Sequence, residues 1–292
     1  MYNFAHVSAE VTALPRYRIL SFFLATHGLT WVFFIPFAVL QWSVDDFPRN
    51  LLFFAGGLGP LVAALLFVRG TRDATYMREY AARIISFGRI SGRWWSAILL
   101  LPPAVTLSGI VIAAVLTGGS LQPDNLLNIS TIRNVTVFYI LLMLLAPLIE
   151  EIAWRGYGQD ALHSRFGLAA TSLILGVLWW SWHLPLFFMA DTYQSGLGLL
   201  TVQSLEFLVW CVATAFVMTW IYHGTTGSIL AAIVYHFMLN VANELLLTDA
   251  AAEIARSAIQ IALALVLILV LPRLKRDDGT RRVEMWRPAR SN

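Results

Sequence analysis

The length, composition and charge of the chain indicate a membrane protein and exclude a pair of soluble domains. The 292 residues are 58% hydrophobic and 13% charged, whereas soluble domains carry about 25% charged residues. The mean hydropathy of +0.69 agrees with this. The single cysteine, Cys211, excludes an internal disulfide and a cysteine-clustered metal site. The basic residues lie in loops between apolar segments, which is typical of membrane topology and speaks against nucleic acid as a partner.

Eight apolar segments are long enough to cross the membrane, because a helix needs about 20 residues to span about 30 Å of hydrocarbon. They are residues 19–42, 50–68, 94–117, 134–155, 167–190, 198–222, 227–247 and 254–272. The charged segment from Asp73 to Gly92 predicts a helix lying on the membrane surface. We therefore predict an all-α fold, with residues 1–292 forming one membrane-embedded domain of about eight transmembrane helices in contact with lipid. No cleaved signal peptide is expected.

The positions of the basic residues predict the orientation, because positively charged loops stay in the cytoplasm. With the N-terminus inside, 17 of the 20 basic residues are cytoplasmic, and only Arg49, Arg133 and Arg256 lie outside. The basic tail from Arg273 to Arg290 requires an even number of spans, so six or ten spans stay open as alternatives. We expect a multi-pass protein of the cell (inner) membrane with both termini in the cytoplasm.

Ionisable side chains within four of the predicted spans need an explanation, since a charge at the centre of a span costs at least about 2.5–3.5 kcal/mol. The residues are Glu150, Glu151 and Arg155 in the fourth span, His183 in the fifth, Glu206 in the sixth, and His236 with Asn240 and Asn243 in the seventh. For Glu206 we expect a position facing the bundle interior, and a proton or ion role stays open.

The spacing of Glu150, Glu151 and Arg155 separates the two carboxylates. Glu151 and Arg155 stand four residues apart on one helix face, which favours a salt bridge. Glu150 points about 100° away and is left free for chemistry. The alternative is a charge cluster in water at the cytoplasmic end of the helix.

His236 and Asn240 are also four residues apart, which places two hydrogen-bond donors side by side as an oxyanion hole requires. The alternative for this pair is a hydrogen bond between helices, and for His183 a packing role. Together with Glu150 and His183, the pair supplies the groups needed for attack of water on an amide. The HExxH, GxSxG and CxxC motifs of soluble hydrolases and metal sites are absent from the sequence.

These residues resemble the motifs of the CPBP family, which comprises the type II CaaX prenyl endopeptidases and their bacterial, Abi-like relatives. The order Glu150-Glu151-x-x-x-Arg155, then His183, then His236-x-x-x-Asn240 matches the family, and the motifs cover residues 135–245. The family usually has Phe four residues before the first histidine. Here Trp179 takes that position, a change that we interpret as tolerated and as narrowing a substrate groove.

The resemblance implies an intramembrane protease with a catalytic core over residues 135–245 and a cavity that opens toward the cytoplasm. It implies that Glu150 and His183 activate water, that His236 and Asn240 stabilise the oxyanion, and that Glu151 and Arg155 support them. The family is often labelled a metalloprotease family, and Glu150, His183 and His236 would be the zinc ligands if zinc is used. The same residues also suit a metal-free glutamate protease.

The substrate and the class of function stay open at this level. A prenylated CaaX peptide and another membrane-anchored peptide or protein are both compatible with the Trp-rich fifth span. Two other classes of protein use intramembrane carboxylates and histidines: secondary transporters or ion-coupled proteins, and non-catalytic immunity or scaffold proteins. No motif repeats between residues 1–146 and 147–292, which argues against a two-fold transporter.

Overall fold

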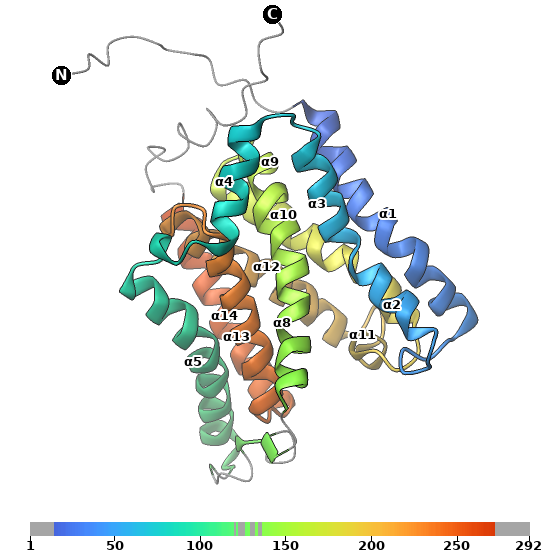
Figure 1. Ribbon diagram of the computed structural model, residues 1–292. Coiled ribbons are helices and arrows are strands. Elements are labelled where there is room, and N and C mark those ends of the chain that lie inside the picture. Colours follow the sequence, from blue (N-terminus) through green and yellow to red (C-terminus); the bar gives the residue numbers. More distant parts are fainter. Residues whose placement is uncertain (1–14, 120, 122–125, 129–131, 134–135, 272–292) are drawn as a thin grey trace, which may run out of the picture.

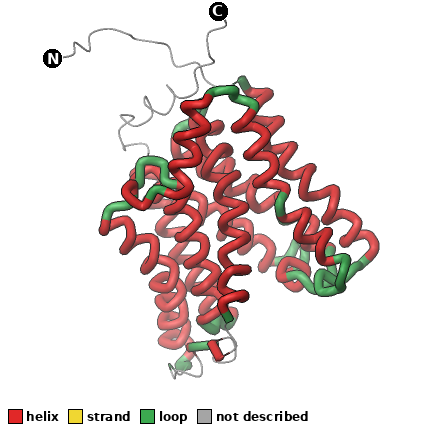
Figure 2. Tube along the Cα trace, viewed as in Figure 1, coloured by secondary structure: helices red, strands yellow, loops and turns green. Residues whose placement is uncertain are grey.

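The computed structural model describes residues 15–119, 121, 126–128, 132–133 and 136–271. The described residues form helices joined by turns, with no strand (Figures 1 and 2). This confirms the predicted all-α fold. Residues 1–14 and the basic tail from Arg273 to Arg290 lie outside the described residues.

Eight long helical stretches run back and forth through the bundle, and each matches a predicted span. They are α1 (Arg16–Leu40), α2 with α3 (Asn50–Gly57 and Gly59–Arg69), α5 (Gly92–Thr117), α8 with η2 and α9 (Val137–Glu151, Ile152–Gly158 and Gln159–His163), α10 with η3 (Leu168–Trp182 and Leu184–Phe188), α12 (Val202–Gly224), α13 (Ile229–Leu245) and α14 (Ala250–Val270). Among the described residues, six stretches are long and apolar enough to span a membrane. The stretches of α8 and α13 are the exceptions, and they carry most of the predicted site.

Hydrogen bonds between loops define the two ends of the bundle. At one end, Arg89 donates to the Thr226 carbonyl, which joins the turn before α5 to the turn after α12. At the other end, Gln41 donates to the Phe188 carbonyl, and the Leu247 amide donates to the Leu126 carbonyl. The first end carries most of the described arginines, and we call it the arginine-rich end. Helix α1 begins there and α14 ends there, as an even number of passes requires (Figure 1).

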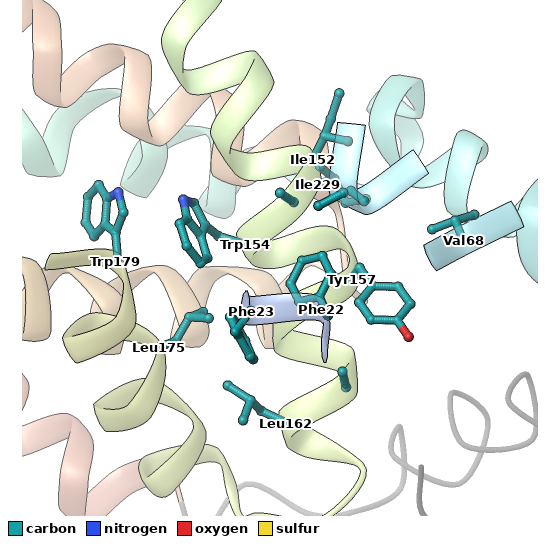
Figure 3. Close-up of a cluster of buried hydrophobic side chains, with 14 of the residues drawn as sticks. Phe22, Phe23, Val68, Ile152, Trp154, Tyr157, Leu162, Leu175, Trp179 and Ile229 are labelled. Atoms are coloured by element: carbon teal, nitrogen blue, oxygen red, sulfur yellow. The ribbon is translucent and has the colours of Figure 1, made fainter. Parts of the chain in front are cut away.

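Helix α8 occupies the centre of the molecule. Helices α1 and α3 pack together on one side of it, and α5, α13 and α14 pack together on the other (Figure 1). Helix α10 packs along α12. Side chains from five of these stretches meet in one buried apolar cluster: Phe22, Phe23, Val68, Ile152, Trp154, Tyr157, Leu162, Leu175, Trp179 and Ile229 (Figure 3). The polar site lies beside this cluster, since Trp179 belongs to both.

The predicted end of the fourth span at residue 155 was wrong. The helix continues through η2 and α9 to His163, and Arg155, Gln159 and Asp160 are all buried along it. Because these side chains are polar, they resemble a helix end in the sequence. The longer helix places Glu150 13 residues before its end at His163, and His183 15 residues after the start of α10. At about 1.5 Å per residue, both lie about 20–23 Å from the arginine-rich end.

The charged segment after Arg72 forms the predicted helix, α4 (Ala74–Ile85), capped by the Asp73 carboxylate, and the turn η1 (Phe87–Arg89). One of its arginines is not on the surface: Arg83 is 1% exposed and forms an ion pair with Asp160 at 2.8 Å. Tyr222 donates to the other oxygen of Asp160. Burial lowers the pKa of Arg83, but Asp160 and the neighbouring tyrosines more than offset this and hold the pKa well above its usual range. A charged pair therefore fixes α4 to the bundle.

Close packing of α10 on α12 depends on Gly176. A Cβ atom at this position would lie 2.6 Å from the Cα atom of Val212, and small residues at such crossings let two backbones approach. We expect Gly176→Ala to lower the free energy of unfolding by about 1–3 kcal/mol, because the added methyl group must push the helices apart. Thermal unfolding in detergent measures this. Gly28→Ala is the control, since Gly28 is inside α1 with open space around it, and equal stability of both variants would contradict the prediction.

Candidate active site

The candidate site is built on the point where α8 changes from α-helix to π-helix. Glu150 and Glu151 are the last α-helical residues, and the wider turn η2 begins at Ile152. Such π segments leave one carbonyl group without its usual partner and are frequent at functional sites. Every residue from Ile149 to Leu162 is buried. The paired glutamates therefore lie inside the protein, on a stretch whose backbone is already distorted.

Glu151 is the centre of a buried charge cluster. Arg155 donates to its Oε1 atom at 3.1 Å and lies 3.0 Å from its Oε2 atom, as the four-residue spacing predicted. Nδ1 of His236 lies 2.9 Å from Oε1 of the same carboxylate. The side chains of Glu151 and Arg155 are 0% exposed. The alternative of a charge cluster in water at the end of the helix was wrong.

Glu150 points away from this cluster, as predicted, and reaches α10. The indole Nε1 of Trp179 donates to its Oε2 atom at 2.7 Å. A phenylalanine, the residue usual at this position in the resembling family, could not make this bond. Trp179 is 2% exposed and lines none of the three cavities described in the bundle. In the structure, Trp179 donates a hydrogen bond that orients the Glu150 carboxylate. The sequence had indicated a side chain that narrows a substrate groove.

His183 caps the C-terminal end of α10, one turn after Trp179. Its Nδ1 atom lies 2.8 Å from the Trp179 carbonyl oxygen, so Nδ1 carries the hydrogen and donates. In the neutral ring, this leaves the Nε2 lone pair free to accept a proton. The side chain is 9% exposed and contacts the rings of Trp182 and Phe207 edge-on. The neutral ring of His183 is thus held in the tautomer that suits a base.

Asn240 lies one turn beyond His236 on α13, as the spacing predicted. Its Nδ2 atom is 3.4 Å from the Met143 carbonyl oxygen, a long hydrogen bond to the early part of α8. For His236, Nδ1 is engaged by Glu151, so only Nε2 can face a substrate. Nε2 donates only when the ring is protonated. Nδ1 carries a hydrogen and donates to the Glu151 carboxylate, which fixes the orientation of the ring.

The ring of Trp179 brings the predicted site residues together. Its centroid lies 6.1 Å from that of His183 and 5.4 Å from that of His236, and the Arg155 guanidinium lies 5.1 Å from the ring. No hydrogen bond joins Glu150 to His183 within the described residues, and Trp179 connects them through its indole and its carbonyl. Glu150, Arg155, His183 and His236 therefore all contact Trp179, and Glu151 joins them through Arg155 and His236.

The carboxylates and histidines of the site are not arranged as zinc ligands. In the part of the chain that the structure describes, no three His, Cys, Asp or Glu side chains are placed to hold a metal ion. Nδ1 of both site histidines is engaged and Nε2 is open, as in metal-bound histidines, so it is the lack of three converging ligands that speaks against a zinc ion here. Glu150, His183 and His236, the ligands expected if zinc is used, are therefore not placed to hold one ion.

Tyr80 supports the site, although no motif in the sequence contains it. This residue of α4 is 3% exposed, and its hydroxyl donates to the carbonyl of Ile152, the first residue of the π segment. Gly156 lies directly under the tyrosine ring, because a Cβ atom there would lie 2.6 Å from the hydroxyl. Helix α4 therefore contacts the backbone immediately after the paired glutamates.

A cavity of about 530 Å³ opens beside Asn240. Its lining includes Met143, Asn240, Asn243, Glu253 and Arg256, all on the side of the site that faces away from the arginine-rich end. A smaller cavity adjoins it and contains Glu206, which accepts a hydrogen bond from Ser257 at 2.6 Å. The resemblance implied a cavity open to the cytoplasm, and the arginine count places the cytoplasm at the opposite end. The two expectations cannot both hold for this cavity.

The antiparallel apolar helices define a polytopic membrane protein. Inside the bundle, carboxylates and histidines are buried around one tryptophan. Comparison with known proteins narrows the class. Residues 132–242 match the family described as type II CAAX prenyl endopeptidase Rce1-like. The chain is 27% identical to CAAX prenyl protease 2 of Methanococcus maripaludis over 256 aligned residues. The aligned region covers 87% of this chain and 94% of that relative.

Over residues 132–242 the chain is similar to the type II CAAX prenyl endopeptidases, and this similarity supports an intramembrane peptidase of the CPBP type. The matched region spans α8 to α13 and thus contains Glu150, His183, His236 and Asn240.

Proposed function

We propose that the protein hydrolyses a peptide bond within the membrane, with Glu150 and His183 activating water and with His236 and Asn240 binding the oxyanion. The observation that carries the proposal is the bond from Trp179 to Glu150, together with the Trp179 carbonyl that orients His183. Through these contacts one tryptophan orients a carboxylate from one helix and an imidazole from another. The catalytic core is residues 135–245 of a single membrane-embedded domain.

Water activation requires a group that accepts a proton near the carbonyl carbon of the substrate. The free Oε1 atom of Glu150 and the free Nε2 atom of His183 are the two acceptors. A water molecule held between them loses a proton to one of them as its oxygen attacks the carbonyl carbon. The same proton then passes to the leaving nitrogen, so the enzyme returns to its starting state.

Stabilisation of the oxyanion falls to α13. In the proposed step, His236 donates from Nε2 when both ring nitrogens carry a hydrogen, and Asn240 donates from Nδ2 after exchanging the long bond to Met143 for the substrate oxygen. Donors placed before the reaction are worth about 2.7–4 kcal/mol each in comparable sites. Glu151 accepts the hydrogen bond from Nδ1 of His236 and so orients the ring, and Arg155 pairs with the same buried carboxylate.

The proposed substrate is a peptide or protein with a lipid anchor, either a prenylated CaaX sequence or another membrane-anchored segment. The name of the archaeal relative supports the first kind. A substrate that is already held in the bilayer reaches a buried site by lateral diffusion, without crossing a polar surface. The cell (inner) membrane is the proposed location.

We expect the purified protein in detergent to cleave a farnesylated CaaX peptide more efficiently than the same peptide without the farnesyl group. The apolar anchor contributes about 0.8 kcal/mol per buried CH₂ group, so the difference in kcat/KM should exceed tenfold. Fluorescence release and mass spectrometry measure it. A parallel sample with a zinc chelator should cleave equally fast. Equal cleavage of both peptides would contradict the prenyl specificity and leave the peptidase function standing.

A further inference from the structure

Helix α4 contacts α8 at both ends of its π segment. The Tyr80 hydroxyl donates to the carbonyl of Ile152, the first residue of η2. About one turn later on α4, Arg83 forms an ion pair at 2.8 Å with Asp160, two residues beyond the end of η2 at Gly158. Tyr80 and Arg83 are 3% and 1% exposed, so both contacts are shielded from water. One helix therefore holds the stretch that follows the paired glutamates at its start and just beyond its end.

The π segment sets the direction in which the paired glutamates point. The Gln159 amide donates to the Trp154 carbonyl, five residues back, where an α-helix would bond four residues back. A wider turn of this kind adds one residue to the helix, which corresponds to about 100° of α-helical rotation. If the segment relaxed to α-helix while Asp160 stayed paired, the glutamates would turn by about this angle. They would then point away from Trp179 and His236, their partners on other helices.

The contact of Tyr80 lies where the two helical forms diverge. In an α-helix, the Ile152 carbonyl would accept from the amide of Gly156, four residues on. Tyr80 donates to this carbonyl and lies against Gly156, since a Cβ atom there would be 2.6 Å from the hydroxyl. The two forms direct the Ile152 carbonyl differently, and the hydroxyl reaches it in the π form. The contact therefore favours the π form at the first residue of the segment.

We propose that Tyr80 is a positioning residue of the active site, whose hydroxyl stabilises the π form of α8 and thereby fixes the directions of Glu150 and Glu151. This inference rests on the proposed peptidase function and adds a residue of α4 to it. Tyr80 acts through the backbone of Ile152 and touches none of the reacting atoms. Loss of the hydroxyl should slow the chemical step rather than weaken substrate binding, because a displaced catalytic group costs rate.

The test is the cleavage of the farnesylated CaaX peptide by Tyr80→Phe, with kcat and KM measured separately. We expect kcat to fall by about tenfold to a hundredfold and KM to stay within about twofold of the wild-type value. The control is Tyr222→Phe, which removes a hydroxyl that is 1% exposed and donates to Asp160 at 2.7 Å, beyond the π segment. It should lose a similar amount of thermal stability and keep the wild-type kcat.

Gly156→Ala tests the same contact from the other side. The added Cβ atom should displace the Tyr80 ring from Ile152, so we expect kcat to fall in this variant as well. Because both changes break one contact, the double variant Tyr80→Phe/Gly156→Ala should be no more than about twofold slower than the slower single variant. Independent losses would multiply instead.

The outcomes separate the two proposals. A wild-type kcat in folded Tyr80→Phe overturns the role of Tyr80 and leaves the peptidase function intact. An equal loss of kcat in Tyr222→Phe, or losses that multiply in the double variant, overturn it as well. If Tyr80→Phe does not fold, Gly156→Ala decides, and a wild-type kcat there overturns the role. Absence of cleavage by folded wild-type protein overturns the proposed function, and this inference with it.

Discussion

Glu150→Gln is expected to lower the rate of peptide cleavage by about 10²–10⁴-fold, the contribution typical of a general base. The variant keeps a side-chain oxygen that can accept the Trp179 indole, so the position of the side chain and the thermal stability should be unchanged. What it loses is the ability to take a proton from water. Single-turnover cleavage at saturating enzyme measures the chemical step directly.

Two further variants locate the effect. Glu79→Gln alters a glutamate that pairs with Arg89 near the protein surface, and its cleavage rate should match that of the wild type. Trp179→Phe removes the indole donor to Glu150, and we expect a loss of about tenfold to a hundredfold, since a hydrogen bond to a charged group is worth about 1.5–3 kcal/mol. Full activity in Glu150→Gln would mean that this carboxylate is not the base.

Arg155→Met is expected to lower the free energy of unfolding by about 3–5 kcal/mol, because it leaves the carboxylate of Glu151 buried without its main counterion. Both side chains are 0% exposed, so water cannot take the place of the guanidinium. Methionine has a similar length but no charge, so the variant removes the ion pair with Glu151 and the cation contact with the Trp179 ring without opening a large cavity. Unfolding by heat or by SDS in mixed micelles gives the measurement.

The matched control is Arg89→Met. Arg89 and Glu79 form an ion pair at 2.6 Å whose side chains are 23% and 29% exposed, and pairs near the surface contribute about 1 kcal/mol or less. The double variant Glu151→Gln/Arg155→Met should regain part of the lost stability, since no unpaired carboxylate remains. If Arg155→Met were as stable as Arg89→Met, the buried cluster would have no structural role.

Hydropathy alone predicted the helices well. Fifteen of the sixteen ends of the predicted spans agree with the structure to within four residues. The exception is the end of the fourth span, where Arg155 and Asp160 are polar in the sequence but buried by partners on other helices. Pairing between helices is a tertiary property, and a single polar residue carries no signal of it. Pairing between helices also explains Arg83, which was expected on a helix at the membrane surface. Its side chain is buried between α4 and the bundle, where it pairs with Asp160.

The site was predicted in part. Helical spacing correctly indicated the Glu151–Arg155 salt bridge and the separate direction of Glu150. Spacing could not reveal that Glu151 also binds His236 from a helix 85 residues away in sequence. Nor could it identify Tyr80, because this residue belongs to no recognisable motif. The roles of Glu150, His183, His236 and Asn240 in catalysis are still predictions, and the variants above test them.

The orientation of the bundle links the site to its substrate. If the arginine-rich end is cytoplasmic, the cavity beside Asn240 faces the other half of the bilayer, because its lining residues lie toward the opposite end. Cysteine labelling from one side of sealed vesicles distinguishes the two cases, and Cys211 is buried and leaves a clean background.

The central claim is that water, activated inside the bundle, cleaves a peptide bond. The most direct measurement is mass spectrometry of the farnesylated peptide after incubation with purified wild-type protein in water enriched in heavy oxygen. Two products are predicted, with one heavy oxygen atom in the new carboxylate of the farnesylated fragment and none in the released C-terminal piece. An intact peptide after incubation with folded protein, or products without the heavy oxygen, would contradict the account.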